Sequence, residues 1–148
     1  MSMIGLIQRV STAKVDVAGE TIGAIEQGLL CLIGVRRGAT ASDVERLATR
    51  LLRYRVFPDA EGRMNRSVQD IRGGLLLVPQ FTLAADTRSG NRASFSTAAP
   101  PEQARAHFEA LVTRLQRADQ VCVQTGRFGA DMQVSLVNDG PVTFWLEP

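Results

Sequence analysis

The sequence predicts an α+β fold in which mostly antiparallel sheets, in a barrel-like or sandwich-like arrangement, are covered by two main helices. Three observations carry this prediction. Segments typical of strands stand before, between and after the helical segments, only two stretches have helical periodicity, and turn residues join several of the strand segments. With so many strands and so few helices, we expect the helices to cover the outer faces of the sheets.

The strand segments are identified by apolar bulk, short length and turn residues at their ends. Residues 14–17 and 21–25 flank Ala18-Gly19-Glu20 like the arms of a hairpin, and residues 29–35 form an apolar run typical of a fully buried strand. The turn signal over residues 138–141 is expected to separate the last two strands. The predicted strands cover residues 3–10, 14–17, 21–25, 29–35, 75–80, 121–125, 132–138 and 142–146.

Two segments have the period of an amphipathic helix. The first is predicted over residues 42–54, where Ser42 can cap the helix and Glu45 can complete a capping box. The second begins at Pro100 and Pro101, which suit a first helical turn. Each helix has one apolar face that we expect to cover the sheet. These faces consist of Val44, Leu47, Leu51 and Leu52 in the first helix, and of Ala104, Phe108, Leu111, Val112 and Leu115 in the second.

The length and composition predict one globular domain over residues 1–148. The chain is 45% hydrophobic and 22% charged, which excludes disordered, collagen-like and disulfide-scaffold proteins. Cys31 and Cys122 each lie in an apolar run and are expected to be buried, although a disulfide between them stays open. Residues 1–10 do not resemble a secretion signal, and no apolar run reaches the length of a membrane span, so we expect a cytoplasmic protein.

The basic residues are almost all arginine, since Lys14 is the only lysine among 17 basic side chains. Arginine favours planar, multi-donor recognition of phosphate and carboxylate. The segment from Arg36 to Arg72 contains nine arginines and five acidic residues, although the net charge of the whole chain is only +2. A solvated basic surface explains this segment more readily than a nucleic-acid interface does.

Most familiar catalytic and cofactor motifs are absent from the sequence. The single histidine, His107, lies in the second predicted helix without a neighbouring cysteine or second histidine, so we expect no metal site and no catalytic role for it. A nucleophile elbow, a P-loop and a dinucleotide-binding turn are also missing. We therefore expect no cofactor.

Three polar features remain as candidates. The segment Pro79-Gln80-Phe81-Thr82-Leu83 ends a buried strand with an amide, an aromatic ring and a hydroxyl, and Gly140-Pro141 lies where two strands are expected to join. Residues 86–95 form a polar loop with two arginines that could bind a phosphate backbone. Each feature also has a purely local explanation, as a strand end, a turn and an ordinary loop.

Taken in order along nearly the whole chain, these and further segments resemble the D-aminoacyl-tRNA deacylases, the proofreading hydrolases that release D-amino acids from mischarged transfer RNA. Any one segment could match by accident, but the ordered set is specific. The segments that carry the resemblance are Ile7-Gln8-Arg9-Val10, Tyr54-Arg55-Val56-Phe57, residues 59–65, residues 80–87, residues 125–132 and residues 137–143.

The resemblance implies a homodimer with each active site at the subunit interface. A Gly-Pro step with a cis peptide bond, Gly140-Pro141 here, is then inserted into the partner's pocket, and Arg9 matches an arginine that braces this step. The family's catalytic segment Ser-Gln-Phe-Thr-Leu is matched by Gln80, Phe81, Thr82 and Leu83, but its serine is replaced by Pro79.

The resemblance also implies a mechanism that needs few protein groups. An aminoacyl ester is already labile, so oriented N–H donors and the neighbouring 2′-hydroxyl of the terminal adenosine can suffice. We expect the backbone N–H groups of Phe81 and Thr82 to lie near the ester, and Thr82 to position rather than attack, because no base adjoins it in sequence. A wall of main chain at Gly140-Pro141 would exclude L side chains but not glycine, which predicts glycyl-tRNA(Ala) as a second substrate.

Two other classes of protein stay open at this point. An RNA-binding protein on the same scaffold, with Pro79 marking lost catalysis, would bind transfer RNA and release no amino acid. A small-molecule acyl hydrolase would cleave free D-amino acid esters without the steep salt dependence of phosphate-driven RNA binding.

Overall fold

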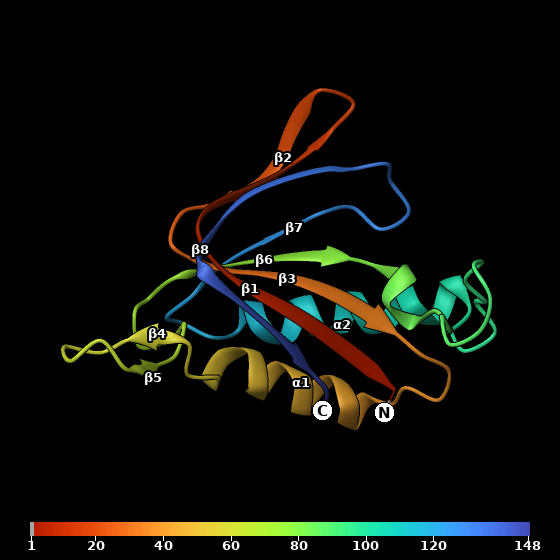
Figure 1. The fold of residues 1–148 in the computed structure, drawn as a ribbon, viewed down its shortest axis with the longest axis horizontal. Helices are drawn as coiled ribbons and strands as arrows, with labels where there is room; N and C mark the ends of the chain where they lie inside the picture. The colour runs from red at the N-terminus through yellow and green to blue at the C-terminus, as the bar shows by residue number, and fades with distance from the viewer. Residues whose placement is uncertain (1) are drawn as a thin grey trace.

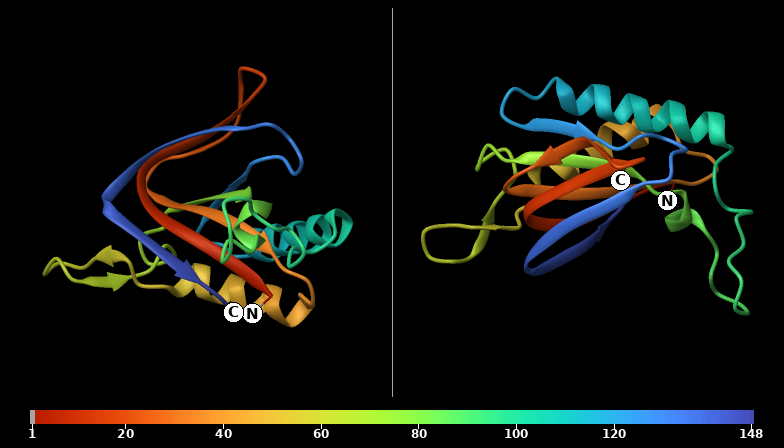
Figure 2. Two further views of the ribbon diagram at one scale, coloured as in Figure 1. Left: turned by 45° about the vertical axis from the view of Figure 1, so that its right-hand side comes forward. Right: turned by 90° about the horizontal axis from the view of Figure 1, so that it is seen from above.

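A long central strand, β1, organises the fold that the computed structural model describes for residues 2–148 (Figure 1). The strands of the main sheet are β1 (Met3–Val17), β2 (Glu20–Ile25), β3 (Gly28–Val35), β6 (Gly74–Pro79), β7 (Cys122–Thr125) and β8 (Gln133–Leu146). They follow the order β2-β1-β3-β6-β7, and β8 pairs with β1. The sheet curves into a half-barrel, and the predicted hairpin turn at Ala18-Gly19 is present between β1 and β2 (Figure 2).

The α+β prediction is confirmed, but the sheet is mixed rather than antiparallel throughout. Strand β1 is antiparallel to β2, β3 and β8, whereas β3, β6 and β7 run parallel to one another. The parallel pairs arise because each connection contains a helix, α1 (Ala41–Arg53) before β6 and α2 (Pro101–Gln116) before β7. A crossover of this kind carries the chain back to the end of the sheet where the preceding strand began, so the next strand runs parallel to it.

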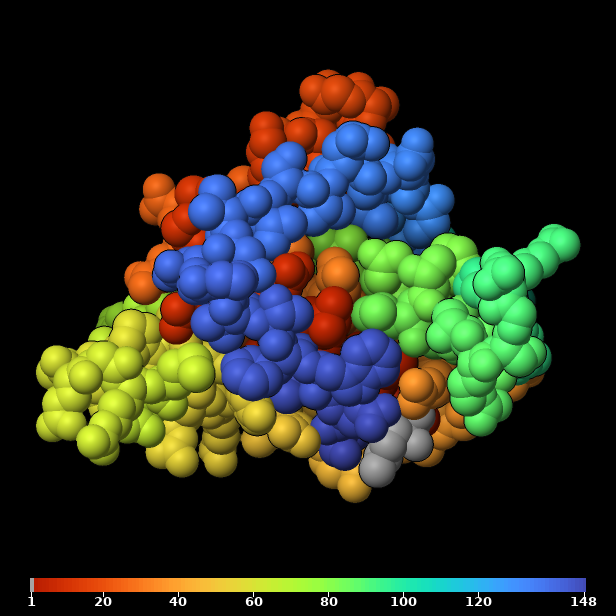
Figure 3. All heavy atoms as spheres, viewed as in Figure 1, coloured from red at the N-terminus to blue at the C-terminus, as the bar shows by residue number. Residues whose placement is uncertain are grey.

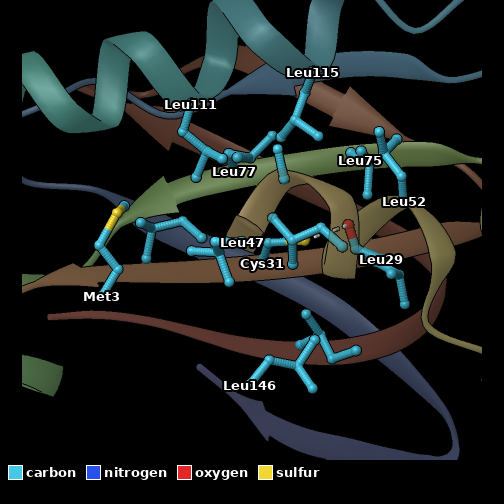
Figure 4. Packing of buried hydrophobic residues seen from close by; sticks show 14 of the residues in the cluster. Met3, Leu29, Cys31, Leu47, Leu52, Leu75, Leu77, Leu111, Leu115 and Leu146 are labelled. Carbon is cyan, nitrogen blue, oxygen red and sulfur yellow. Dashed lines mark hydrogen bonds between the residues drawn. The ribbon is translucent and has the colours of Figure 1, made fainter. Parts of the chain in front are cut away.

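The two helices pack side by side on one face of the sheet, not on separate outer faces (Figure 2). Their predicted apolar faces meet β3 and β6 in one buried core (Figure 4), apart from Val112, which is only half-buried. The predicted cap of α1 is wrong by two residues. Thr40 is the cap of α1, and the backbone N–H of Thr40 donates to the Asp43 side chain at 2.9 Å. Thr40 and Asp43 therefore form the capping box in place of Ser42 and Glu45.

The expected turn between the last two strands is also wrong, because residues 133–146 form a single bent strand. Both arms of β8 pair with β1, and the register shifts twice between Gln8 and Thr12, opposite the bend. The chain therefore bends at Gly140-Pro141 and keeps its direction along β1 (Figure 2). Along β8, the edge that faces away from β1 pairs with no strand among residues 2–148.

Smaller elements complete the structure. Strands β4 (Phe57–Pro58) and β5 (Met64–Arg66) form a two-stranded sheet that the sequence did not predict, and the 3-10 helix η1 (Phe81–Ala84) follows β6. Both cysteines are free thiols. Cys31 is buried as predicted, but Cys122 is exposed, since it begins the short edge strand β7. Among residues 2–148, no helix combines the length and the apolar character needed to cross a bilayer.

Candidate functional site

The bend in β8 exposes Gly140 and Pro141 to solvent, and the peptide bond between them is cis. Gly140 has φ +138°, a conformation that residues with a side chain rarely adopt. A Cβ atom at this position would lie 2.7 Å from Val142 Cγ2, 3.0 Å from Val142 N and 3.2 Å from Arg9 Nη2. Only glycine fits here without a shift of the surrounding atoms.

Arg9 holds the bend from the neighbouring strand. Its Nε donates to the carbonyl oxygen of Asp139 at 3.0 Å, and its Nη1 donates to the carbonyl oxygen of Val56 at 2.7 Å. The Asp139 carboxylate lies 3.7 Å from Arg9 Nε, and the Arg9 side chain is only 13% exposed. One guanidinium thus joins β1, the residue before Gly140 and the segment that leads into β4. The flat, multi-donor fork of arginine suits this bridging geometry.

A second bond across the bend comes from Asn138. Its side-chain oxygen accepts from the backbone N–H of Val142 at 3.1 Å, and its amide nitrogen donates to Thr143 Oγ1 at 3.1 Å. The two arms that flank Gly140-Pro141 are therefore tied to each other as well as to Arg9. The resulting surface is an exposed piece of main chain with a fixed shape.

The second predicted motif forms the start of η1. Gln80 N–H donates to the Ile33 carbonyl oxygen at 2.7 Å, and Leu83 N–H donates to the Gln80 carbonyl oxygen at 3.2 Å. The N–H groups of Phe81 and Thr82 lie at the beginning of the 3-10 helix, where the helix itself offers no acceptor. Neither of these N–H groups makes a backbone hydrogen bond within residues 2–148. Two adjacent main-chain donors are therefore available to a ligand.

The Thr82 hydroxyl is bound by an amide and not by a base. Gln80 Nε2 donates to Thr82 Oγ1 at 2.6 Å. Within residues 2–148, no carboxylate or imidazole accepts a hydrogen bond from Thr82, and His107 lies half-buried on α2. A threonine without a general base is a weak nucleophile, so this geometry favours a positioning role.

A groove of about 870 Å³ opens beside the start of η1, and we call it the aromatic groove. Phe81, Phe95 and Phe128 line it, and the Phe81 and Phe95 rings lie 5.2 Å apart. Phe81 is 60% exposed, which is unusual for so large an apolar side chain. The groove is lined by Arg37, residues 78–81, Phe95, residues 98–101, Ala104, residues 128–130, Met132 and Val134.

Pro79 forms part of the groove wall. It is the last residue of β6, two positions beyond the last pair that β6 makes with β7. Proline is tolerated at such a strand end because the ladder needs no donor there. Proline therefore fits the backbone at this position, but it offers neither the N–H nor the hydroxyl of a serine.

On the other side of η1 lies a hollow that contains Thr82, Asp86, Arg88 and Trp145, and we call it the Thr82 pocket. In Figure 3 it is visible between the blue strand β8 and the green segment that follows β6. Asp86 accepts from the Arg88 side chain at two oxygens, each at 2.9 Å, and these bonds lower the pKa of Asp86 to about 2. The carboxylate is ionised at neutral pH and is a poor proton acceptor.

One chain does not bring the two motifs together. Arg9, which contacts the bend, pairs with Leu29, and Leu29 pairs with Leu75 near the start of β6. Gln80 lies five residues further along the same direction, which corresponds to about 16 Å of extended strand. The bend of β8 therefore lies beside the start of β3 and β6, whereas η1 follows the end of β6. In Figure 1, the bend of the blue strand and the green segment after β6 lie on opposite sides of the view.

The comparisons with known proteins agree with the resemblance read from the sequence. The family described as D-Tyr-tRNA(Tyr) deacylase matches residues 6–147. A D-aminoacyl-tRNA deacylase of Alkalilimnicola ehrlichii is 63% identical over 145 residues, covering 98% of this chain and 96% of the relative. One of Stutzerimonas stutzeri is 61% identical over 145 residues, covering 98% and 99%.

Solved structures share the same fold. A c-Myc DNA unwinding element binding protein superposes with a TM-score of 0.91 at 38% identity, covering 98% of both chains. A probable eukaryotic D-amino acid tRNA deacylase superposes with a TM-score of 0.86 at 14% identity, covering 100% of both chains. The fold and the relatives together define a hydrolase that acts on aminoacyl-tRNA. The chain belongs to the D-aminoacyl-tRNA deacylase family.

The aromatic groove is the part of the site that sequence reasoning missed. Phe128 and Met132 stand in a segment that carries the resemblance, and Phe95 ends the polar loop, but no pattern indicates that they face one another. The main signal in the sequence is three phenylalanines outside the periodic apolar faces of the helices. That signal is weak, since isolated aromatics are common in loops.

Proposed function

We propose that each active site is made by two copies of the chain, with η1 from one copy and Gly140-Pro141 from the other. The observation that carries this proposal is the separation of the two motifs, which lie at opposite ends of one sheet and cannot serve the same ester within one chain. In a two-fold dimer, both subunits contribute the same surface to the interface. The η1 of each subunit can then face Gly140-Pro141 of the other.

The free edge of β8 is the surface that favours this dimer. The strand is 14 residues long, and Val137 and Trp145 on it are 56% and 49% exposed. A long edge strand with exposed apolar side chains is a template for association unless another chain covers it. An interface along this edge would also hold the bend at Gly140-Pro141 against the partner.

The substrate end of the transfer RNA is proposed to lie in the aromatic groove, with the ester over the N–H groups of Phe81 and Thr82. These donors would stabilise the negative charge that develops on the carbonyl oxygen. The 2′-hydroxyl of the terminal adenosine would assist the attack by water, which accounts for catalysis without a protein base. The Gln80 amide holds the Thr82 hydroxyl and would keep η1 in its orientation.

Chirality is proposed to be tested by the partner's Gly140-Pro141. Its exposed main chain, held by Arg9 and Asn138, would occupy the space toward which an L side chain points. A D side chain points the other way and is accepted, so the selection works by exclusion. Glycine has no side chain to exclude, and glycyl-tRNA(Ala) is therefore a second substrate. We place this activity in the cytoplasm, where aminoacyl-tRNA is used.

Subunit mixing tests the shared site. A Gly140→Ala chain and a Thr82→Pro chain, which lacks one N–H donor, carry different affinity tags, and the heterodimer is isolated through both. Such a heterodimer contains one intact site and one doubly altered site, so we expect half of the wild-type rate per dimer. If each site lies within one chain, both sites are altered and the heterodimer stays as inactive as its parents. Circular dichroism confirms that both parents are folded.

The chemistry is tested with D- and L-tyrosyl-tRNA, each with and without the terminal 2′-hydroxyl. We expect cleavage of the D ester alone and its loss on the 2′-deoxy substrate. Equal cleavage of both enantiomers contradicts chiral exclusion, and full cleavage of the 2′-deoxy ester contradicts assistance by the RNA. Binding of the transfer RNA without release of D-tyrosine would support the RNA-binding alternative.

A further inference from the structure

We propose that Arg37 binds the phosphate of the terminal nucleotide of the transfer RNA and thereby sets the depth at which the ester enters the site. The inference rests on the proposed position of the acceptor end in the aromatic groove. It assigns a substrate-binding role to a residue that the family's signature segments do not include, and it rests on the contacts and the charge of the groove wall.

Arg37 is held at the groove by one side of its guanidinium. Its Nε donates to the Ser96 carbonyl oxygen at 2.7 Å, and its backbone N–H donates to the Thr97 carbonyl oxygen at 3.0 Å. The two Nη atoms make no hydrogen bond or ion pair with residues 2–148. The side chain is thus oriented by the protein, and its outer donors remain available to an anion.

The charge of the groove favours an anionic group beside Arg37. Among the described residues that line the groove, Arg37 is the one charged side chain, and no carboxylate is present. The remaining lining consists of aromatic and aliphatic side chains, backbone and one amide. A nucleotide combines a flat base with a phosphate one sugar away, which matches an aromatic wall with a single guanidinium at its side.

Two other arginines in this part of the molecule, Arg105 and Arg88, are already engaged. Arg105 stacks over the Phe128 ring at 4.9 Å and lies 3.9 Å from a Glu109 carboxylate oxygen. Arg88 is bound to both oxygens of Asp86. A phosphate at the groove would have to compete with these partners, whereas at Arg37 it would add bonds without breaking any.

The test compares three substrates of increasing phosphate content. They are 3′-D-tyrosyl-adenosine, its 5′-monophosphate and D-tyrosyl-tRNA, and the variants are Arg37→Gln and Arg37→Lys. For Arg37→Gln we expect kcat/KM to fall about tenfold on both phosphate-bearing substrates, through KM, and to stay unchanged on the nucleoside. Arg37→Lys retains the charge and is expected to recover part of the loss.

Salt dependence gives a second measurement. Loss of one phosphate contact is expected to reduce the slope of log kcat/KM against log salt by about 0.7 with D-tyrosyl-tRNA. The matched control is Arg53→Gln, an exposed arginine in the last turn of α1, which should leave both the rate and the slope unchanged.

Two results would overturn the proposal. If Arg37→Gln lowers cleavage of the nucleoside as much as that of the phosphorylated substrates, Arg37 shapes the groove and binds no phosphate. If neither the rate nor the salt slope changes on D-tyrosyl-tRNA, the phosphate lies elsewhere. Failure of the shared-site proposal is seen separately, as an inactive heterodimer in the subunit-mixing experiment. Arg37→Gln should leave the ratio of D to L cleavage unchanged.

Discussion

The bend in β8 and the start of η1 are built in opposite ways. The bend lies on an exposed edge strand, and its shape depends on a glycine with φ +138° and on the Arg9 side chain. The start of η1 follows a buried strand and is fixed by main-chain bonds, including those from Gln80 N–H and Leu83 N–H. A single side-chain change should therefore harm the bend more than η1.

The largest effect is expected from Gly140→Ala. The new Cβ would collide with Val142 and approach Arg9, and alanine at φ +138° is strained by about 1 to 3 kcal/mol. We expect D-tyrosyl-tRNA cleavage to fall roughly 10- to 100-fold and the preference for D over L to narrow. The cleavage rates of D-tyrosyl-tRNA and L-tyrosyl-tRNA measure both the fall in activity and the change in preference. An unchanged preference would mean that the bend does not test chirality.

Removal of the Arg9 brace ranks second. Arg9→Lys and Arg9→Gln cannot bond the Asp139 and Val56 carbonyl oxygens together, and loss of these bonds is expected to cost about 1 to 2 kcal/mol. Cleavage of D-tyrosyl-tRNA should fall about tenfold in both variants. Equal activity of the lysine variant and the wild type would show that charge alone, without the fork, supports the bend.

A smaller loss is expected when Thr82 is replaced by alanine. The hydroxyl accepts one neutral hydrogen bond from Gln80, which is worth about 0.5 to 1.5 kcal/mol, so kcat should fall only roughly two- to tenfold. Single-turnover kinetics with saturating enzyme separate this loss from weaker binding. Near-complete loss of kcat with intact substrate binding would identify Thr82 as the nucleophile.

The smallest effect concerns Asp86, beside η1. Its pKa is about 2 because Arg88 binds the ionised carboxylate, so this contribution to stability is present above the ordinary pKa near 3.8 and is lost as the pH falls toward 2. Arg88→Gln should raise the Asp86 pKa toward 3.8 and leave cleavage at neutral pH unchanged. Carboxyl NMR titration measures the pKa, and an unaltered value would mean that Arg88 does not hold Asp86.

Periodicity and turn chemistry predicted local structure well and pairing poorly. The first helix lies within one residue of its predicted bounds, and the second begins at Pro101 as predicted, since an amphipathic face is a local property of the chain. The parallel pairing of β3 with β6 was not predicted, because it depends on how the crossover helix packs. The predicted turn at residues 138–141 became a bend within β8, because both arms found the same partner strand.

By itself, the sequence determined the α+β class, the two apolar helix faces and the motifs that place the chain in its family, because each depends on residues that are close in sequence. Tertiary structure alone decided that the two motifs lie at opposite ends of the sheet, that three phenylalanines meet in one groove, and that Arg37 stands beside them. Those relations depend on strand register and on packing between distant segments, which no local pattern encodes.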